Sequence, residues 1–366
     1  MLALNKKPSE TKVIVAMSGG VDSSAVAALM HEKGYEVIGI TLQLYDFGAA
    51  LQKKGACCAG QDIHDARRVA EKLGIPHYVL NYESLFKEEV MEDFADSYIR
   101  GETPIPCIRC NQSVKFRDLL KVAKDLEADA LVTGHYVRRI DGENGAELHS
   151  AIDDKKDQAY FLFATTKEQL EYLHFPLGNM TKAETRKLAE RFGLAVADKP
   201  DSQDICFVPE GNYAKVVERL RPGALDSGEI VHVDGAVMGK HEGIINYTIG
   251  QRRGLGIAAG EPLYVVRIEA DTNKVIVGPE SSLFNQEFFI KDINWLAEEI
   301  PAEGIKAKVK LRSAQKALPA TIKRPKNGVA KVNLHEPIKS ITPGQACVAY
   351  NGSRVLGGGW ITREIG

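Results

Sequence analysis

Val13-Ile-Val-Ala-Met-Ser-Gly-Gly-Val-Asp-Ser-Ser24 is the stretch that decides the fold of this chain. Its apolar, β-branched start, Val13–Met17, is typical of a buried parallel strand, and Gly19 and Gly20 then turn the chain into a helix rich in Ala, Val and Leu. The glycines let backbone N–H groups point inward, and the helix dipole adds partial positive charge beside them. The stretch therefore predicts a phosphate-binding loop between a strand and a helix.

This loop differs from a Walker loop, because it has no Gly-Lys-Ser/Thr to clamp the β- and γ-phosphates. It resembles the PP-loop of the ATP pyrophosphatase superfamily, whose members cut ATP between the α- and β-phosphates and adenylate an acceptor oxygen. The resemblance implies that Gly19, Gly20, Ser23 and Ser24 hold the leaving pyrophosphate, while Asp22 helps to position Mg²⁺. An ordinary strand–helix turn with capping serines is the alternative.

Length and composition indicate an ordinary globular protein of two or three domains: 366 residues, of which 44% are hydrophobic and 26% charged. The formal net charge of −2 means that any nucleic-acid surface must come from local segregation of charge. No apolar run approaches the roughly 20 residues of a membrane span, and the start has no long apolar leader. We therefore expect a cytoplasmic location and no membrane partner. We also expect a monomer.

Strand-like and helical patterns alternate in the first half of the chain. The apolar, β-rich runs are 37–42, 77–80 and 130–133, and the amphipathic helical patterns are 63–73 and 116–126. This alternation predicts a doubly wound parallel α/β sheet with its ligand at the carboxyl ends of the strands. Leu42 and Gly134, at two such ends, are candidates to line an adenosine pocket, although plain packing would explain either residue alone.

The second half changes character twice. From Thr166 to Gly193 the pattern is helical and charged, with Thr181-Lys-Ala-Glu as a capping box, which predicts an inserted helical arm at about 166–200. From Glu229 onward, short strands are separated by glycine turns. We expect three domains: the phosphate-loop domain over 1–207, a small β-rich central domain over 208–280 and a C-terminal β-barrel over 281–366.

The cysteines point to sulfur or metal chemistry, since six in a chain without a secretory leader are unlike a disulfide framework. Cys107 and Cys110 form a Cys-x-x-Cys just after two prolines, which places two thiols on one restricted turn. Half a zinc knuckle is the alternative, but the other close pair is the adjacent Cys57-Cys58. Cys206 lies in a polar, turn-rich stretch that favours a reactive thiol. Together with an adenylating loop, these cysteines indicate sulfur insertion.

Seven motifs follow one another along nearly the whole chain. They are Ser18-Gly-Gly-Val-Asp-Ser-Ser24, Cys57-Cys58, Thr103-Pro-Ile-Pro-Cys-Ile-Arg-Cys-Asn111, Thr133-Gly-His-Tyr136, Lys156-Asp-Gln-Ala-Tyr-Phe-Leu162, Ser202-Gln-Asp-Ile-Cys-Phe207 and Tyr247-Thr-Ile-Gly-Gln-Arg-Arg-Gly-Leu-Gly256. The ordered set resembles the tRNA-specific 2-thiouridylase family. That resemblance implies conversion of the wobble uridine of certain tRNAs to 2-thiouridine, with ATP and Mg²⁺, tRNA and a protein persulfide donor (a cysteine desulfurase or a relay protein) as partners.

The resemblance also assigns roles to individual residues. Cys206 would carry the persulfide, and Cys110 would be the nucleophile that releases the sulfur or resolves the persulfide by forming a disulfide. The implied ATP site is Ala16, Met17, Ser18, Gly19, Gly20, Val21, Asp22, Ser23, Leu42 and Gly134. The implied target-base contacts are Ile105, Pro106 and Cys107, and the implied tRNA contacts are His135, Lys156, Asp157, Gln158, Arg312, Ser313 and Gln345. His135 as a general acid or base is a further possibility.

Two mechanisms remain open at the cysteines. The family commonly has Asn where this chain has Ile105, and some members have Asp where it has Cys107. Family members have also been argued to carry an iron–sulfur cluster, for which Cys107, Cys110 and Cys206 would be the three thiolate ligands. Other classes are a PP-loop ligase such as a lysidine synthetase, which would not need these cysteines, and a non-catalytic RNA-binding or sulfur-carrier protein, which would not need the phosphate loop.

Positive charge is concentrated in the C-terminal region. Between Gly304 and His335 there are nine Lys or Arg residues and no acid, and Ile305-Lys-Ala-Lys-Val-Lys-Leu-Arg312 alternates so that one strand face is entirely positive. This pattern favours contact with an RNA backbone, while an edge strand protected by lysines is the alternative. The arm residues Lys182, Arg186, Lys187 and Arg191 are either a solvated face or a second backbone contact.

Overall fold

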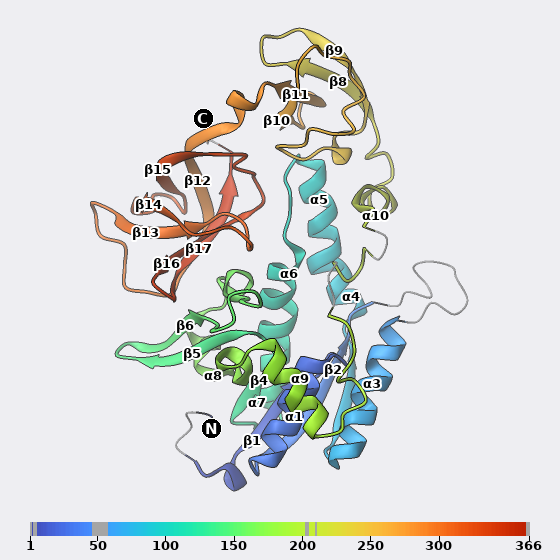
Figure 1. Cartoon of the computed structure of the whole chain (residues 1–366), viewed down its shortest axis with the longest axis vertical. Coiled ribbons are helices and arrows are strands. Elements are labelled where there is room, and N and C mark those ends of the chain that lie inside the picture. The colour runs from blue at the N-terminus through green and yellow to red at the C-terminus, as the bar shows by residue number, and fades with distance from the viewer. Residues whose placement is uncertain (1, 3–5, 46–57, 202–204, 209–210, 364–366) are drawn as a thin grey trace. The chain divides into compact units, whose positions relative to one another are not determined.

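The computed structural model describes residues 2, 6–45, 58–201, 205–208 and 211–363 (Figure 1). The chain forms two compact units. The first contains 1–89, 107–207 and 352–355, and the second contains 90–106, 208–351 and 356–366. No described helix is long and apolar enough to cross a membrane.

A five-stranded parallel sheet forms the centre of the first unit. Its strands, in spatial order, are β3 (His77–Asn81), β2 (Glu36–Gln43), β1 (Lys12–Ala16), β4 (Ala130–Val132) and β7 (Leu173–His174). β1 pairs in parallel with β2 on one side and β4 on the other. The strand order therefore reverses at β1, and the crevice at such a reversal is where open α/β sheets bind their ligands. The predicted parallel α/β sheet is confirmed.

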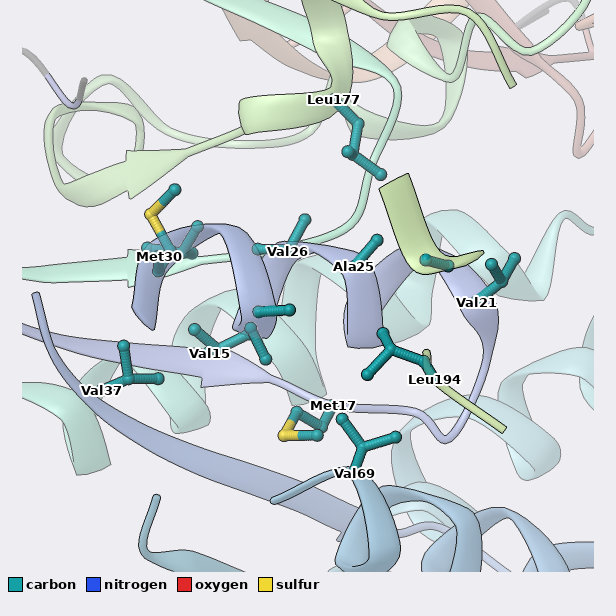
Figure 2. Close-up of a cluster of buried hydrophobic side chains, with 14 of the residues drawn as sticks. Val15, Met17, Val21, Ala25, Val26, Met30, Val37, Val69, Leu177 and Leu194 are labelled. Atoms are coloured by element: carbon teal, nitrogen blue, oxygen red, sulfur yellow. The ribbon is translucent and has the colours of Figure 1, made fainter. Parts of the chain in front are cut away.

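The helices of this unit cover the sheet with small and branched side chains. They are α1 (Val21–Glu32), α3 (Cys58–Leu73), α4 (Glu83–Phe86), α7 (Leu119–Asp125), α8 (Lys167–Tyr172) and α9 (Lys182–Arg191). Figure 2 shows Ala25, Val26 and Met30 of α1 in the same buried cluster as Val15 and Met17 at β1. Because α1 buries Ala and Val on most of its surface, it packs closely on the sheet and holds the loop before it in place.

The segment expected to be a helical arm belongs to this core. α8 and α9 are helical as predicted, and both begin with capping boxes, at Thr166 and Thr181. The same segment also contributes β7, which pairs with β4 in the parallel sheet. In addition, α9 lies beside α1 (Figure 1), and its Ala189 is fully buried. The sequence did not predict β7, because two residues are too few to produce a strand pattern.

The helix predicted over 116–126 starts earlier and is irregular. The short helix α6 (Pro106–Arg109) leads into a π-helical segment, Cys110–Asp118, and only then into α7. A π-helix bonds residue i to residue i+5, is rare, and is frequently found at functional sites. Cys110 is the first residue of this segment.

Several short helical elements and one hairpin lie outside the main sheets. They are the 3₁₀ turns Pro8–Glu10, Ala159–Leu162, Pro176–Asn179, Ile244–Asn246 and Glu280–Leu283, the π-helical Lys87–Glu92, the helices α5 (Asp93–Ile99) and α10 (Tyr213–Leu220), and the hairpin β5 (Val137–Gly142) and β6 (Gly145–Ser150).

The second unit is built from β-structure. A four-stranded sheet has the order β10 (Tyr264–Glu269), β11 (Lys274–Gly278), β8 (Ser227–His232) and β9 (Val237–Glu242). The C-terminal strands follow the order β12 (Phe284–Trp295), β15 (Ala330–Lys339), β14 (Leu318–Ile322), β13 (Ile305–Lys310), β16 (Ala346–Asn351) and β17 (Arg354–Thr362), and β12 also pairs with β17. This closure confirms the predicted barrel.

The lysine-rich strand is an interior strand of the barrel. β13 pairs with β14 on one side and β16 on the other. The explanation that its lysines protect a sheet edge is therefore wrong, because both sets of backbone groups are already paired. Val309, between Lys308 and Lys310, is fully buried in the barrel core, so the predicted alternation of apolar and positive faces is confirmed.

Candidate active site

The phosphate loop is shaped by a close approach of two backbones. β1 ends at Ala16 and α1 begins at Val21, with Gly20 as the N-cap residue. Gly19 has φ +72°, and a Cβ at this position would lie 2.1 Å from the carbonyl oxygen of Asp62 in α3. Only glycine fits there, both because of its left-handed backbone and because of the missing side chain. The structure thus has the strand, glycine turn and helix N-terminus that the sequence predicted for an anion site.

A cavity of about 240 Å³ lies beside this loop. Seven of the residues assigned to ATP line it: Ala16, Met17, Ser18, Asp22, Ser23, Leu42 and Gly134. Gly19, Gly20 and Val21 complete the loop between Ser18 and Asp22. At Gly134 an added Cβ would lie 2.9 Å from the backbone nitrogen of Ser23, so glycine at the end of β4 allows the two segments to meet. The sequence could assign these residues to an ATP site only separately. The structure shows that they come from the ends of three strands and line one cavity.

The cavity has further walls that the sequence did not identify. They are Ile40, Leu44, Lys115, Phe116, Leu119, Leu131 and Thr133, together with His135 and Gln158 from the predicted tRNA contacts. Most of these side chains are apolar, as expected for a pocket that takes a flat base and a sugar. For Phe116 and Leu119, the signal was the amphipathic pattern over 116–126, which shows a buried face but not what that face covers.

His135 is held in an apolar setting. Its Nδ1 lies 2.7 Å from the hydroxyl oxygen of Thr133, and its ring packs edge-on against Phe116 and Phe175. Desolvation, helped by the positive charge of Lys115, lowers the pKa of His135 to about 3. The ring is therefore neutral near pH 7 and is a poor proton acceptor, which argues against the general acid or base role.

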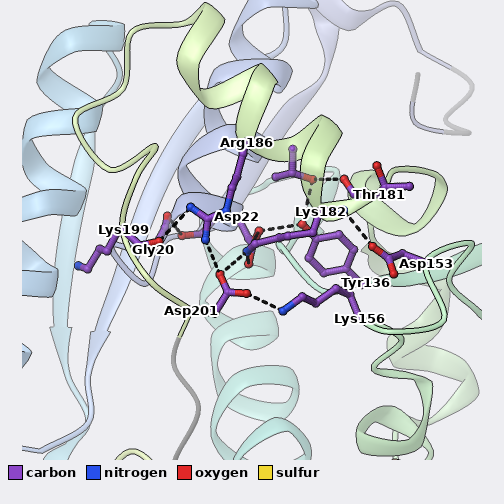
Figure 3. Close-up of polar contacts among 12 residues, drawn as sticks. Gly20, Asp22, Tyr136, Asp153, Lys156, Thr181, Lys182, Arg186, Lys199 and Asp201 are labelled. Atoms are coloured by element: carbon purple, nitrogen blue, oxygen red, sulfur yellow. Dashed lines mark hydrogen bonds and ion pairs between the residues drawn. The ribbon is translucent and has the colours of Figure 1, made fainter.

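Ion pairs connect the phosphate loop to α9 (Figure 3). The Nζ of Lys182 lies 2.7 and 2.8 Å from the two carboxylate oxygens of Asp22, and the Tyr136 hydroxyl donates to Asp22 at 2.8 Å. Lys182 also lies 2.9 Å from Asp201, which pairs with Lys156 at 2.6 Å and Arg186 at 2.9 Å. Lys182 and Arg186 therefore belong neither to a solvated face nor to a free basic patch.

The charge state of Asp201 follows from this arrangement. Burial pushes its pKa upward, but hydrogen bonds from Lys156 and Lys182 and the charges of both outweigh burial and lower the pKa to about 2. Asp201 is thus ionised at any physiological pH. The remaining arm cations behave differently, since Arg191 pairs with Glu32 at 2.6 Å, and Lys187 is exposed.

The residues at the loop could hold a magnesium ion only if a substrate supplied further oxygen ligands. Mg²⁺ is commonly held by one or two carboxylates plus substrate phosphates, and Asp22 is a carboxylate that lines the cavity. Its oxygens already accept bonds from Lys182 and Tyr136. Asp22 would therefore have to share its oxygens between these donors and the ion.

The three cysteines singled out by the sequence lie near one another. Cys110 is buried and Cys107 and Cys206 are exposed, and all three are free thiols. Desolvation, together with the nearby Cys110 and Cys107, raises the pKa of Cys206 to about 12. Desolvation also raises the pKa of Cys110, which is buried, and of Cys107, which is exposed but is surrounded by protein atoms on its other sides, against the opposing charge of Lys115. In this conformation the thiols are protonated at neutral pH, so reaction needs a change in their surroundings.

The structure tests the iron–sulfur alternative at these cysteines but not the zinc alternative. Among the described residues, no three His, Cys, Asp or Glu side chains are placed to hold a metal ion. The three thiols are therefore not a ready-made cluster ligand set in this conformation. Cys57 lies outside the described residues and the side chain of Cys58 is not described, so the zinc alternative that needed this pair stays a prediction.

The residues assigned to the target base and tRNA take part in local structure. Within the second unit, the Gln345 side chain donates to the carbonyl oxygen of Thr103 at 2.7 Å, just before Ile105 and Pro106. Arg312 donates to the Ser340 carbonyl oxygen at 3.0 Å. The structure thus places Gln345 beside the segment that carries the predicted base contacts.

The other predicted tRNA contacts lie in the first unit. Asp157 accepts bonds from the backbone nitrogens of Ala151 and Ala159, and Gln158 accepts one from that of Tyr136. Asp157 and Gln158 therefore fix the turn that follows Lys156. No sequence signal separated this structural role from an RNA-binding role.

The chain contains a parallel α/β domain whose phosphate loop lacks the Walker lysine. A small β-domain and a β-barrel follow it, and this combination defines the class of protein. Three family models match the chain in the same order: a tRNA methyl transferase HUP domain over 11–210, a tRNA methyl transferase PRC-barrel domain over 215–279 and an aminomethyltransferase β-barrel domain over 285–361.

Full-length relatives give the family. The chain is 63% identical to the tRNA-specific 2-thiouridylase MnmA of Rickettsia felis, over 99% of this chain and 100% of that protein. It is 64% identical to the protein of the same name from Rickettsia massiliae, with the same coverage, and 62% identical to that from Rickettsia bellii, over 99% of both chains. The chain belongs to the tRNA-specific 2-thiouridylase family.

Proposed function

We propose that this protein is an ATP-dependent tRNA sulfurtransferase that replaces the 2-oxygen of the wobble uridine with sulfur, giving 2-thiouridine, AMP and pyrophosphate. One observation carries the proposal. Lys115 lines the cavity beside the phosphate loop, and it lies in the π-helical segment Cys110–Asp118, which begins with Cys110. One short segment therefore carries both a wall of the cavity and the predicted nucleophile, as adenylation followed by sulfur transfer requires.

The first half of the reaction would use the cavity. A uracil carbonyl is a poor electrophile with a poor leaving group, and adenylation of its oxygen lets AMP depart. The N–H groups at the start of α1 and the helix dipole would hold the β- and γ-phosphates. A magnesium ion beside Asp22 would neutralise phosphate charge. Ala16–Ser23, Leu42 and Gly134 would surround the nucleotide.

The second half would use the cysteines. The terminal sulfur of a Cys206 persulfide attacks the adenylated carbon and AMP leaves, so that the base is joined to Cys206 through two sulfurs. The Cys110 thiolate then attacks the Cys206 sulfur, which forms a Cys110–Cys206 disulfide and releases the thiolated base. A thiol reductant must afterwards reduce this disulfide. In the alternative route, Cys110 attacks the persulfide first and releases sulfide as the nucleophile.

The partners follow from this chemistry. A persulfide donor, either a cysteine desulfurase or a relay protein, would load Cys206, whose exposed thiol suits transfer from outside. The tRNA would contact Ile105, Pro106 and Cys107 at the target base and His135, Lys156, Asp157, Gln158, Arg312, Ser313 and Gln345 elsewhere. We infer a monomer that works in the cytoplasm, where its tRNA substrate is found.

One assay tests the proposal. The protein is incubated with tRNA, Mg·ATP and a persulfide donor, and the digested RNA is searched by mass spectrometry for a uridine with sulfur in place of oxygen. We expect that product together with AMP and pyrophosphate. ADP and phosphate as the tRNA-dependent products would contradict the PP-loop assignment. A modified base without sulfur would instead indicate another adenylating ligase.

A further inference from the structure

One lysine ammonium group connects the phosphate loop to α3. The Nζ of Lys199 donates to the carbonyl oxygen of Gly19 at 3.0 Å. The same Nζ lies 2.7 Å from a carboxylate oxygen of Asp62 and 2.7 Å from one of Asp65, and both aspartates belong to α3. These contacts set the direction in which the Gly19 carbonyl group points.

Lys199 is itself held in place and keeps its charge. Arg186 of α9 donates to the carbonyl oxygens of Ala197 and Lys199 at 2.7 and 3.1 Å, which fixes the backbone there (Figure 3). Desolvation acts to lower the pKa of Lys199, but the hydrogen bonds and charges of Asp62 and Asp65 outweigh it and raise the pKa. The ammonium group is therefore charged, and two carboxylates already neutralise it. A cation paired in this way is suited to holding a position rather than to attracting a phosphate.

The loop needs such a contact because its turn consists of two glycines. Glycine adopts positive and negative φ about equally, so the peptide between Gly19 and Gly20 has little preference for one orientation. That peptide is trans and planar, and its C=O and N–H groups therefore point in opposite directions. With the Gly19 carbonyl oxygen held by Lys199, the Gly20 N–H points away from Lys199 and from α3. None of the described residues that line the cavity belongs to α3.

We propose that Lys199 is a positioning residue, which holds the Gly19 carbonyl group so that the Gly20 N–H is directed at the pyrophosphate part of the nucleotide. The proposal rests on the proposed function, in which ATP occupies the loop. In the flipped peptide the Gly19 carbonyl oxygen would face the phosphates, and its partial negative charge would repel them. Lys199 thus acts on the two phosphates that leave, whereas Leu42 and Gly134 would surround the adenosine.

The test is calorimetric binding of two nucleotides to the full-length protein: α,β-methylene ATP with Mg²⁺, and AMP, which lacks the pyrophosphate part. Lys199→Met should raise the Kd for α,β-methylene ATP about tenfold, the size of one hydrogen bond to a charged group, and leave the Kd for AMP unchanged. Lys199→Arg keeps a charged donor and should restore part of the lost affinity.

The chain offers a matched control for this substitution. The Nζ of Lys72 also donates to a glycine carbonyl oxygen, that of Gly193. Lys72 lies ten residues after Asp62, which is about 15 Å further along α3. Lys72→Met should therefore bind both nucleotides as the wild-type protein does.

A second variant separates positioning from the plain effect of charge. Asp65→Ala removes a negative charge from the surroundings of the loop, so charge alone predicts tighter binding of α,β-methylene ATP. Removal of one of the two carboxylates that hold the Lys199 ammonium instead predicts weaker binding, and this is the result we expect. The same variant carries the test if Lys199→Met loses its helical circular dichroism.

The possible results separate the two levels of the argument. The positioning role is wrong, and the ATP assignment stands, if Lys199→Met binds α,β-methylene ATP as tightly as the wild-type protein. The same conclusion follows if Lys199→Met weakens AMP binding to an equal extent, or if Asp65→Ala binds α,β-methylene ATP more tightly. If the wild-type protein does not bind α,β-methylene ATP, the ATP assignment itself fails, and the role of Lys199 fails with it.

Discussion

Two lysines of the α/β unit and two lysines of the barrel are used in opposite ways. Lys182 and Lys199 are largely covered, and each is held by two carboxylates at 2.7–2.9 Å. In the barrel, Lys306 and Lys308 are exposed on a strand face, and neither has an ion-pair partner among the described residues. Covered ion pairs depend on geometry and are little screened by salt, whereas exposed charges act over a distance and are screened strongly.

This difference predicts in which of the two regions a substitution should reduce activity most. A change in the α/β unit displaces groups that must meet within bonding distance, so its effect is large and specific. A change on the barrel face removes one of several similar charges, so its effect is graded and depends on salt. The five expectations below are ordered by the size of the expected effect, with the largest first.

The largest effects are expected at the cysteines. Cys206→Ser should abolish both transferable protein-bound sulfur and tRNA thiolation, a loss of at least about a thousandfold. Cys110→Ser should still accept labelled sulfur at Cys206 but form no product. Cys347→Ala, in the barrel core, is the control: it should lower stability and leave sulfur loading unchanged. Labelled sulfur on the protein and on the tRNA is measured for each variant.

Cys107→Ser distinguishes the two sulfur mechanisms. The persulfide route keeps at least part of its activity without this thiol, whereas a three-thiolate cluster loses a ligand. Activity and bound iron are measured in parallel under anaerobic conditions. Thiolation from free sulfide by Cys206→Ser, with activity that follows iron content, would replace the persulfide assignment with the cluster.

The phosphate loop should be the next most sensitive region. Gly19→Ala forces a Cβ against the Asp62 carbonyl oxygen, so the loop backbone must move, and we expect a loss of about a hundredfold in kcat/KM for ATP. Gly34→Ala is the matched control, since Gly34 also has a positive φ but nothing lies near its added Cβ. It should cost only about 1 kcal/mol of stability from backbone strain. Equal ATP kinetics in the two variants would mean that the loop does not bind phosphate.

A graded effect is expected on the barrel. Lys306→Ser together with Lys308→Ser should weaken tRNA binding and lower the slope of log affinity against log salt by about two. The same number of charges is removed in the control pair, Lys33→Ser with Lys187→Ser, on exposed positions of the α/β unit. Binding is measured by filter retention over a range of salt. An unchanged slope in the barrel pair would show that this face does not meet RNA.

The smallest effect concerns the pH dependence of stability. Because the pKa of Asp201 is lowered from 3.8 to about 2, its ion pairs stabilise the folded state fully above pH 4, and this contribution is lost as the pH falls toward 2. Asp201→Asn should therefore lower stability by about 1 kcal/mol at pH 7 and by less at pH 3. Thermal unfolding at both pH values measures this, with exposed Asp198→Asn as control. A difference that does not shrink at pH 3 would mean that Asp201 does not act through its charge.

Features that depend on neighbouring residues could be predicted from the amino-acid sequence. The β-branched run before Gly19 and Gly20 gave the strand, loop and helix, Thr181 with Glu184 gave the capping box of α9, and alternation over 305–312 gave a strand with two unlike faces. Each of these depends on local backbone preference or on the side-chain period of one element. For that reason a single stretch was enough to predict them.

Contacts between side chains that are distant in sequence could be found only from the folded chain. Lys182 and Asp22 are 160 positions apart, and nothing in either stretch signals the other. β13 is an interior strand because it pairs with β14 on one side and β16 on the other, and no feature of β13 encodes that second pairing. The cavity likewise takes its walls from the ends of several strands and from the helix after Cys110. Such contacts arise from how whole elements pack, so the sequence could name the chemistry of this protein but not its arrangement.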